Sequence, residues 1–313
     1  MWYFYKKIDN EELDNLINQI NNLFSKILND ETCIYPDWMR ETRLKVDFEK
    51  FRQAYKLCLN DEKNRLIKAF ELNIKIEEIC KMEIIPISYE KLLTNSSDEF
   101  HKCIEILQSI QSYLYSNLLK LKGFEETAGT LKTYYERFYN ETIEYVCPFC
   151  GLDNMLTSKD LYREAFDHYF PKSKYPFVSF LRENLFPICH TCNSTYKGEK
   201  DPKDYGRTFY PFAPDLNDCE LLFEIKTDEI VDVDIKSEKF INEINTWNEL
   251  FGIKDRIRNF AEVNLSGWLS NVTEVMHNYN LSFEQARNGE MNSCNPKMQG
   301  QKFIKKAILK AYK

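Results

Sequence analysis

The sequence lacks long apolar runs. No stretch in its 313 residues approaches the roughly 18 consecutive apolar residues that a membrane-spanning helix needs. The first residues, MWYFYKKIDNEEL, also lack the charged start, apolar stretch and small-residue cleavage site of a signal peptide. We therefore expect no transmembrane helix and no contact with a membrane, and we expect the chain to reside in the cytoplasm.

Several sequence motifs are also missing. There is neither a Walker A phosphate loop nor a G-x-G-x-x-G dinucleotide motif, so nothing predicts that this chain itself hydrolyses ATP. We see no internal repeat and no long low-complexity linker. Histidine is scarce, with four in the chain. Of these, His101 and His277 lie in no chemical pattern, and we interpret both as structural or surface residues.

Positive charge is not in excess. The chain has 42 Lys and Arg against 49 Asp and Glu, a net charge of −7, whereas a protein that binds nucleic acid usually has a basic face. Only the stretch that begins at Lys297 is basic, with six Lys and no acidic residue. It predicts either a phosphate-binding helix or a solvated amphipathic one. Any contact with nucleic acid is therefore expected to use a local patch, a metal ion or a partner subunit.

The hydrophobic pattern divides the chain into three regions. Residues 1–140 have helical spacing throughout, whereas residues 141–210 concentrate Cys, Gly and Pro, and helical spacing fades there. Residues 211–313 begin with alternating strand-like segments and then return to helical spacing. The predicted fold class is mainly α, with a small α+β unit embedded in it. The clearest predicted helices cover about 13–28, 46–70 and 97–118, and the predicted strands lie near 221 and 230.

Two C-x-x-C pairs stand out among the ten cysteines. Cys147 and Cys150 form the first pair, and Cys189 and Cys192 form the second, with 38 residues between the pairs. Each pair supplies two thiolates from a tight turn, and two pairs complete the tetrahedral shell of a structural zinc ion. We interpret His190, inside the second pair, as a non-ligand because four thiolates already fill such a site. The long gap indicates that other functional residues are looped out between the pairs.

The gap and the residues after it form an ordered pattern of D-H-x-x-P, then N-L, then C-x-x-C-N. This combination resembles the HNH, or ββα-metal, nuclease family, and the resemblance is confined to the 141–210 region. The matching segments are Asp167-His168-Tyr-Phe-Pro171, Glu183-Asn184-Leu185-Phe186-Pro187-Ile188-Cys189 and Cys192-Asn193-Ser-Thr-Tyr-Lys197.

The resemblance implies a role for each matched residue. His168 would be the general base that takes a proton from water, a task suited to an imidazole that titrates near neutrality. Asp167 and Asn193 would hold a catalytic Mg²⁺ or Mn²⁺, which prefer oxygen ligands, while zinc on the four cysteines would be structural. Asn184 would support the metal loop and orient the histidine. Phosphodiester hydrolysis needs such an ion to bind the phosphate and stabilise the leaving oxygen.

The resemblance also implies an arrangement of elements. We expect the turn at Cys147 and Cys150 to open a hairpin whose second strand ends at Asp167-His168. A helix that begins near His190 would then present Asn193 and Lys197. Three lysines, namely Lys172, Lys174 and Lys197, either contact phosphates as point charges or are solvated surface residues.

The expected function is endonucleolytic cleavage of DNA that leaves 5′-phosphate and 3′-hydroxyl ends. The helical flanks and the segment around Trp247 are similar to the HNH subunits of bacterial anti-phage defence systems such as Septu, which work beside an ATPase partner. Two alternatives stay open: an HNH-type RNase, and a zinc-knuckle binding or adaptor module without catalysis. The aromatic run from Tyr134 to Tyr139 has helical spacing, which favours core packing over base stacking.

Overall fold

The computed structural model describes residues 1–40, 42–117, 131–142, 145–157, 159–160, 164–212, 218–294 and 301–312. The described part is mainly helical, as predicted. Its helices are α1 Glu11–Leu28, α2 Arg43–Leu57, α3 Asn60–Asn73, α4 Ile76–Cys80, α5 Tyr89–Leu93, α6 Asp98–Asn117, α8 Leu131–Thr142, α9 Ile241–Phe251, α10 Ile253–Tyr279, α11 Phe283–Ser293 and α12 Lys302–Ala311. Its strands are β1 Phe166–His168, β2 Leu185–Pro187, β3 Glu220–Lys226 and β4 Glu229–Lys236, and short helical segments are η1 Asp37–Met39, η3 Arg182–Asn184, η4 Thr191–Lys197 and η5 Pro202–Tyr205.

The N-terminal helices follow the predicted pattern with one correction. The helix predicted over 46–70 is two helices, because α2 ends at Leu57 and α3 begins at Asn60. The Glu62 carboxylate stabilises this break: it accepts hydrogen bonds from the backbone N–H of Leu59 at 2.9 Å and of Ser97 at 2.7 Å. Glu62 thus caps the starts of two helices, and it satisfies N–H groups that would otherwise lack a partner.

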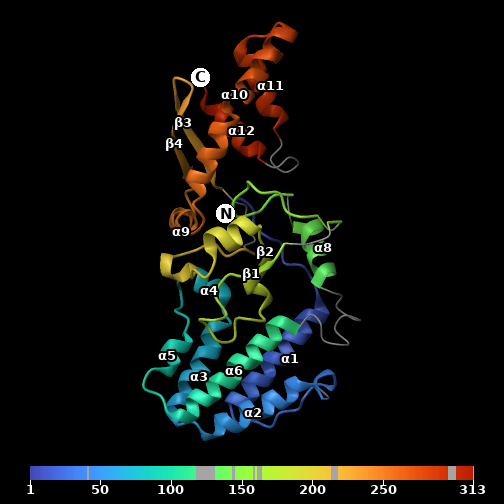
Figure 1. Cartoon of the computed structure of the whole chain (residues 1–313), viewed down its shortest axis with the longest axis vertical. Coiled ribbons are helices and arrows are strands. Elements are labelled where there is room, and N and C mark those ends of the chain that lie inside the picture. Colours follow the sequence, from blue (N-terminus) through green and yellow to red (C-terminus); the bar gives the residue numbers. More distant parts are fainter. Residues whose placement is uncertain are drawn as a thin grey trace.

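At the other end of the chain, β3 and β4 form the antiparallel hairpin that the sequence predicts near residues 221 and 230. This hairpin packs against α10 and α12. Figure 1 shows these elements at one end of an elongated molecule and α1, α2, α3 and α6 at the other, with β1 and β2 between them. No helix in the described part of the chain is long and apolar enough to cross a membrane, as predicted.

The central unit, which corresponds to the 141–210 region, contains two antiparallel strands followed by the short helix η4. Phe166 pairs with Pro187 and His168 with Leu185. This corrects the predicted hairpin, because β1, which carries Asp167 and His168, pairs with the later strand β2. Around the first cysteine pair, the described residues form only an isolated bridge between Val146 and Asn154.

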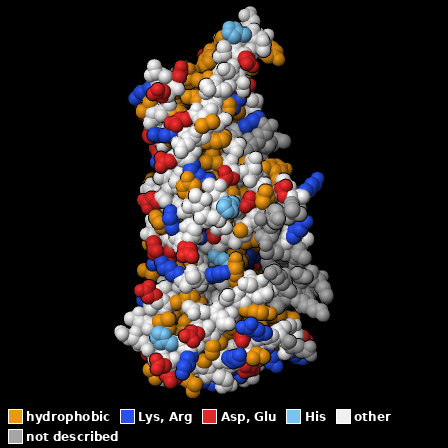
Figure 2. All heavy atoms as spheres, viewed as in Figure 1, with side chains coloured by type: hydrophobic (Ala, Val, Ile, Leu, Met, Phe, Trp, Pro, Cys, Tyr) orange, Lys and Arg blue, Asp and Glu red, His pale blue; other side chains and the backbone are white. Residues whose placement is uncertain are grey.

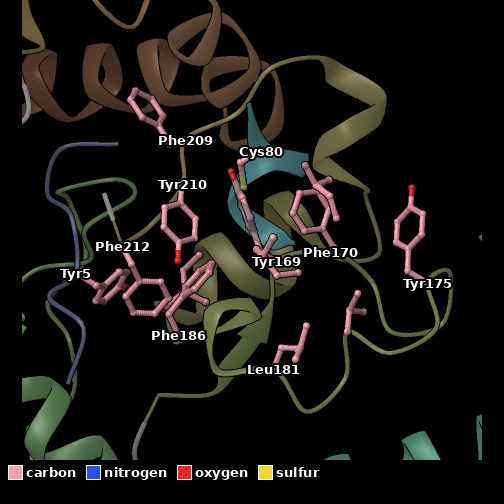
Figure 3. Packing of buried hydrophobic residues seen from close by; sticks show 14 of the residues in the cluster. Tyr5, Cys80, Tyr169, Phe170, Tyr175, Leu181, Phe186, Phe209, Tyr210 and Phe212 are labelled. Carbon is pink, nitrogen blue, oxygen red and sulfur yellow. The ribbon is translucent and has the colours of Figure 1, made fainter. Parts of the chain in front are cut away.

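A continuous hydrophobic core connects the three regions. Its buried members run from Met1 to Ile308 and include residues of the central unit. Figure 3 shows aromatic rings gathered beside the central strands, where Tyr5 stacks on Phe186 at 5.6 Å between ring centroids and Phe212 lies next to both. The aromatic residues of α8 also pack here, as predicted: Phe138 contacts Tyr5 and Phe166. The central unit is therefore packed against chain segments far from it in sequence.

Candidate metal centre and active site

The first cysteine pair lies on a tight turn. The backbone N–H of Cys147 donates to the Asp153 carbonyl at 2.8 Å, and the N–H of Gly151 donates to the Cys147 carbonyl at 2.7 Å. Gly151 has a φ of 67°, a conformation that glycine adopts without strain. The N–H of Leu152 points at the Cys150 sulfur, at 3.4 Å. The turn thus directs both sulfurs to the same side.

The second pair lies where β2 leads into η4. The backbone N–H of Cys192 lies 3.4 Å from the Cys189 sulfur, and the N–H of Asn193 donates to the Cys189 carbonyl at 2.9 Å. Cys192 is therefore inside the helix, and Cys189 just precedes it. The helix that is expected to carry catalytic residues is thus anchored at its start by the cysteine pair.

The four sulfurs converge in one buried cluster. All four Sγ atoms lie within 4.8 Å of one another, with Cys147 and Cys192 separated by 4.0 Å and Cys150 and Cys189 by 3.9 Å. A tetrahedral zinc ion with Zn–S bonds of about 2.3 Å places its sulfurs roughly 3.8 Å apart. The cluster therefore fits zinc, and all ten cysteines of the chain are free of disulfides. The His190 side chain is exposed and outside the cluster, in agreement with its interpretation as a non-ligand.

Asp167 is buried beside a buried lysine. The Lys197 ammonium lies 3.2 Å from Oδ1 and 3.0 Å from Oδ2 of Asp167, and it donates to the His168 carbonyl at 2.8 Å. Lys197 is 2 % exposed. Although Oδ2 is close to the ammonium, it has no well-directed hydrogen bond within the described residues. Burial raises the pKa of Asp167, and Lys197 opposes that rise.

His168 is fixed in one neutral form. Its Nε2 lies 2.8 Å from the Ser179 carbonyl oxygen, which can only accept, so Nε2 carries the proton and Nδ1 keeps its lone pair. Burial lowers the pKa of His168 to about 4, and the positive charges of Lys172 and Lys197 act in the same direction. The ring also contacts Tyr115 of α6, with 4.5 Å between ring centroids. At pH 7 the imidazole is therefore neutral and oriented, with the Nδ1 lone pair as acceptor, but its pKa lies below the near-neutral value expected of the general base.

Asn184 holds the loop between β1 and β2. Its amide nitrogen donates to the carbonyls of Phe170 and Val178 at 3.0 and 3.1 Å, and its Oδ1 accepts from the Phe170 N–H at 2.8 Å. The side chain is fully buried. Its backbone carbonyl also accepts from the N–H of Tyr169, next to His168, at 3.0 Å. These bonds match the supporting role that the resemblance implies.

Asn193 lies on η4, four residues before Lys197. Its side chain is partly exposed and makes no hydrogen bond to the described residues, so its amide oxygen is available as a ligand. Lys197, four residues later on this short π-helix, contacts Asp167 directly. That the Asn193 side chain also points toward Asp167 stays a prediction. Its oxygen and the Asp167 carboxylate are a donor set that suits Mg²⁺ or Mn²⁺.

The three lysines differ in their surroundings. Lys197 is buried in the ion pair with Asp167, so in this structure its charge does not reach the surface. Lys174 pairs with Asp201 at 2.7 Å and Asp204 at 2.8 Å. The Lys172 ammonium lies 2.9 Å from the centre of the Tyr115 ring, and its positive charge helps to lower the pKa of His168. Phosphate contact stays a prediction for all three.

Three contacts escaped the sequence analysis. The carbonyl of Ser179, the ring of Tyr115 and the guanidinium of Arg256, which lies 3.2 Å from the Cys192 sulfur, all come from segments outside the matched motifs. No motif marks them, since a backbone carbonyl carries no residue preference and the other two belong to ordinary helical patterns.

Comparison of the chain with protein-family models, with curated proteins and with solved structures finds no match.

Proposed function

We propose that this chain is a metal-dependent endonuclease of the HNH kind, which hydrolyses phosphodiester bonds of DNA with His168 as general base. The observation that carries the proposal is the fixed neutral imidazole of His168, which is held by the Ser179 carbonyl. His168 directly follows the buried Asp167 on β1. The strand-strand-helix order and the four-cysteine cluster around these residues support it.

The chemistry follows from these positions. With Nε2–H committed to Ser179, the Nδ1 lone pair of His168 takes the proton from the attacking water. Asp167 and Asn193 would hold the divalent ion, which supplies charge stabilisation for the scissile phosphate and the leaving oxygen. Zinc on the four thiolates would hold the unit together, because about 60 residues can bury little core by themselves.

A supercoiled plasmid tests the proposal. Wild type and His168→Ala are compared for nicking in Mg²⁺ or Mn²⁺, with His101→Ala as the matched control because His101 is exposed on α6. We expect the His168 variant to lose about 10²–10⁴-fold of the rate, the range for a general base, and the control to keep full rate. Full Mg²⁺-dependent nicking by His168→Ala would contradict the assignment. A parallel assay on total RNA separates the DNase from the RNase alternative.

One observation favours a second candidate, a zinc-stabilised nucleic-acid-binding or adaptor module without catalysis. Lys197 already neutralises Asp167, and an ion that binds there has to share or displace the ammonium. Such a module binds nucleic acid but leaves the plasmid intact under every metal condition. The same assay with a gel-shift measurement therefore distinguishes the two candidates.

We further propose that a partner protein, an ATPase subunit in an anti-phage defence system of the bacterial cytoplasm, delivers the substrate. The chain has a net charge of −7, and Figure 2 shows acidic and basic side chains interspersed on the visible face rather than gathered in one basic area. Phosphate backbones are bound mainly by Lys and Arg, and we infer that the partner contributes most of them. A pull-down with the products of neighbouring genes tests this. A monomer that cuts DNA alone at full rate would contradict it.

A further inference from the structure

The start of α10 packs directly on the helix that carries Cys192. Gly252 ends α9 and precedes α10 with a φ of 59°. A Cβ on Gly252 would lie 2.8 Å from the Tyr196 ring, so the ring of this η4 residue rests on the glycine backbone. Glycine is needed here both for its positive φ and for the close approach. One turn further along α10, Arg256 reaches over the same ring.

The Arg256 guanidinium is buried, with 9 % of the residue exposed. It lies over the Tyr196 ring, 4.5 Å from the ring centre, and its Nη1 donates to the Cys192 sulfur at 3.2 Å and to the Phe251 carbonyl at 3.3 Å. Its Nη2 lies 3.7 Å from the Asp153 carboxylate, on the turn of the first cysteine pair. A single side chain therefore connects both cysteine segments with α10.

The charges explain why a guanidinium suits this place. Four thiolates around one Zn²⁺ leave two negative charges in a pocket closed to water, which is costly without a counter-charge. A guanidinium stays positive when buried, and its planar form can stack on a ring while it donates in its own plane. Hydrogen bonds to an ionised acceptor are also stronger than neutral ones. A lysine offers the charge and several donors, but it lacks the planar group that stacks on the ring.

We propose that Arg256 is the counter-charge of the four-cysteine metal site and a positioning residue for η4. It lowers the cost of keeping the loaded thiolates buried, and its stack on Tyr196 fixes the helix that carries Asn193. Partners outside the ligand shell of this kind commonly affect metal affinity by about 10–100-fold. The inference rests on the cysteine cluster alone and does not require the chain to be a nuclease.

The test is zinc release from the purified full chain into excess chromogenic chelator. We compare wild type, Arg256→Gln and Arg256→Lys, with Arg258→Gln as the matched control. Arg258 lies on the same helix but is more exposed, and its guanidinium bonds to Val231 and Asp232, away from the cysteines. Arg256→Gln is expected to release zinc at least about ten-fold faster, Arg256→Lys to fall in between, and Arg258→Gln to match wild type. Equal release from Arg256→Gln and wild type would overturn the proposal.

A spectroscopic readout covers the case in which Arg256→Gln does not fold. Zinc is replaced by Co²⁺ in wild type, Arg256→Lys and Arg258→Gln, and the sulfur-to-cobalt charge-transfer bands are recorded. A hydrogen bond to the Cys192 sulfur changes the energy of these bands, so a shift in Arg256→Lys alone supports the proposal. Identical spectra for all three proteins would contradict it. Neither readout depends on plasmid nicking. A failure of this inference can therefore be distinguished from a failure of the proposed nuclease function.

Discussion

The central unit contains two buried polar centres that differ in how complete they are. The cysteine centre brings four identical soft ligands within 4.8 Å of one another, with an external guanidinium beside one sulfur. The Asp167–His168 centre has one carboxylate, already paired with Lys197, and an imidazole whose second nitrogen is committed to Ser179. The first offers a complete set of four ligands that could hold a zinc ion. The second offers few protein ligands, so the hard ion proposed for it would retain several waters.

Removal of the cysteine centre is expected to have the largest effect. Replacement of Cys147 and Cys150 by Ser should abolish zinc binding and unfold the central unit, because metal binding in such sites contributes on the order of 10 kcal/mol of folding free energy. Metal analysis and thermal unfolding measure this, and one zinc per wild-type chain is expected. Cys33→Ser is the control, since Cys33 lies outside the cluster. Wild-type stability in the double variant would show that the cluster is not a zinc site.

Removal of the Lys197 charge probes the second centre. Lys197→Met leaves the buried Asp167 carboxylate uncompensated, so the free energy of unfolding should fall by about 3–5 kcal/mol. If Asp167 is a metal ligand, Mn²⁺ should raise the melting temperature of this variant more than that of wild type, because the ion replaces the lost charge. Lys200→Met, at an exposed position, serves as control. The same Mn²⁺ response in all three proteins would argue against a cation site at Asp167.

The two asparagines should separate stability from activity. Asn184→Ala removes three buried hydrogen bonds and should cost about 2–4 kcal/mol of stability. Asn193→Ala, at a partly exposed position without such bonds, should change stability by less than about 1 kcal/mol and still abolish nicking. Urea unfolding and the plasmid assay measure the two quantities. A reversed order, with Asn193→Ala the less stable protein, would refute the assigned roles.

The dependence of stability on pH should show the smallest effect. The folded-state pKa of His168 is about 4, below the ordinary histidine value of 6.5. The unfolded chain therefore binds the proton first, and the stability contributed by the neutral imidazole is fully present above pH 6.5 and is lost as the pH falls towards 4. The slope is at most about 1.4 kcal/mol per pH unit. Urea unfolding of His168→Asn between pH 7 and 5 should give a flatter profile than wild type, and parallel profiles would contradict the burial argument.

The sequence predicted the ligands better than their neighbours. The cysteine cluster follows from spacing, because C-x-x-C places two sulfurs on one turn whatever the rest of the chain does. The strand pairing of β1 was predicted wrongly, since short strands carry little pattern and their partner is decided by the tertiary fold. The break at Leu59 has no Gly or Pro to mark it and depends on Glu62, whose second partner lies 35 residues away. The burial of Lys197 was not predicted either, because a lysine in a helix is expected at the surface unless its partner is known.

A second metal centre is tested most directly on zinc-loaded protein freed of other metals, by measuring plasmid nicking during titration with Mn²⁺ in wild type and Asp167→Asn. We expect wild type to retain one zinc, to be inactive without Mn²⁺ and to gain activity as the ion is added. We expect Asp167→Asn to retain its zinc and to gain little or no activity. Nicking that needs no ion beyond zinc, or an Asp167→Asn variant as active as wild type, would contradict the existence of a second, oxygen-liganded metal centre.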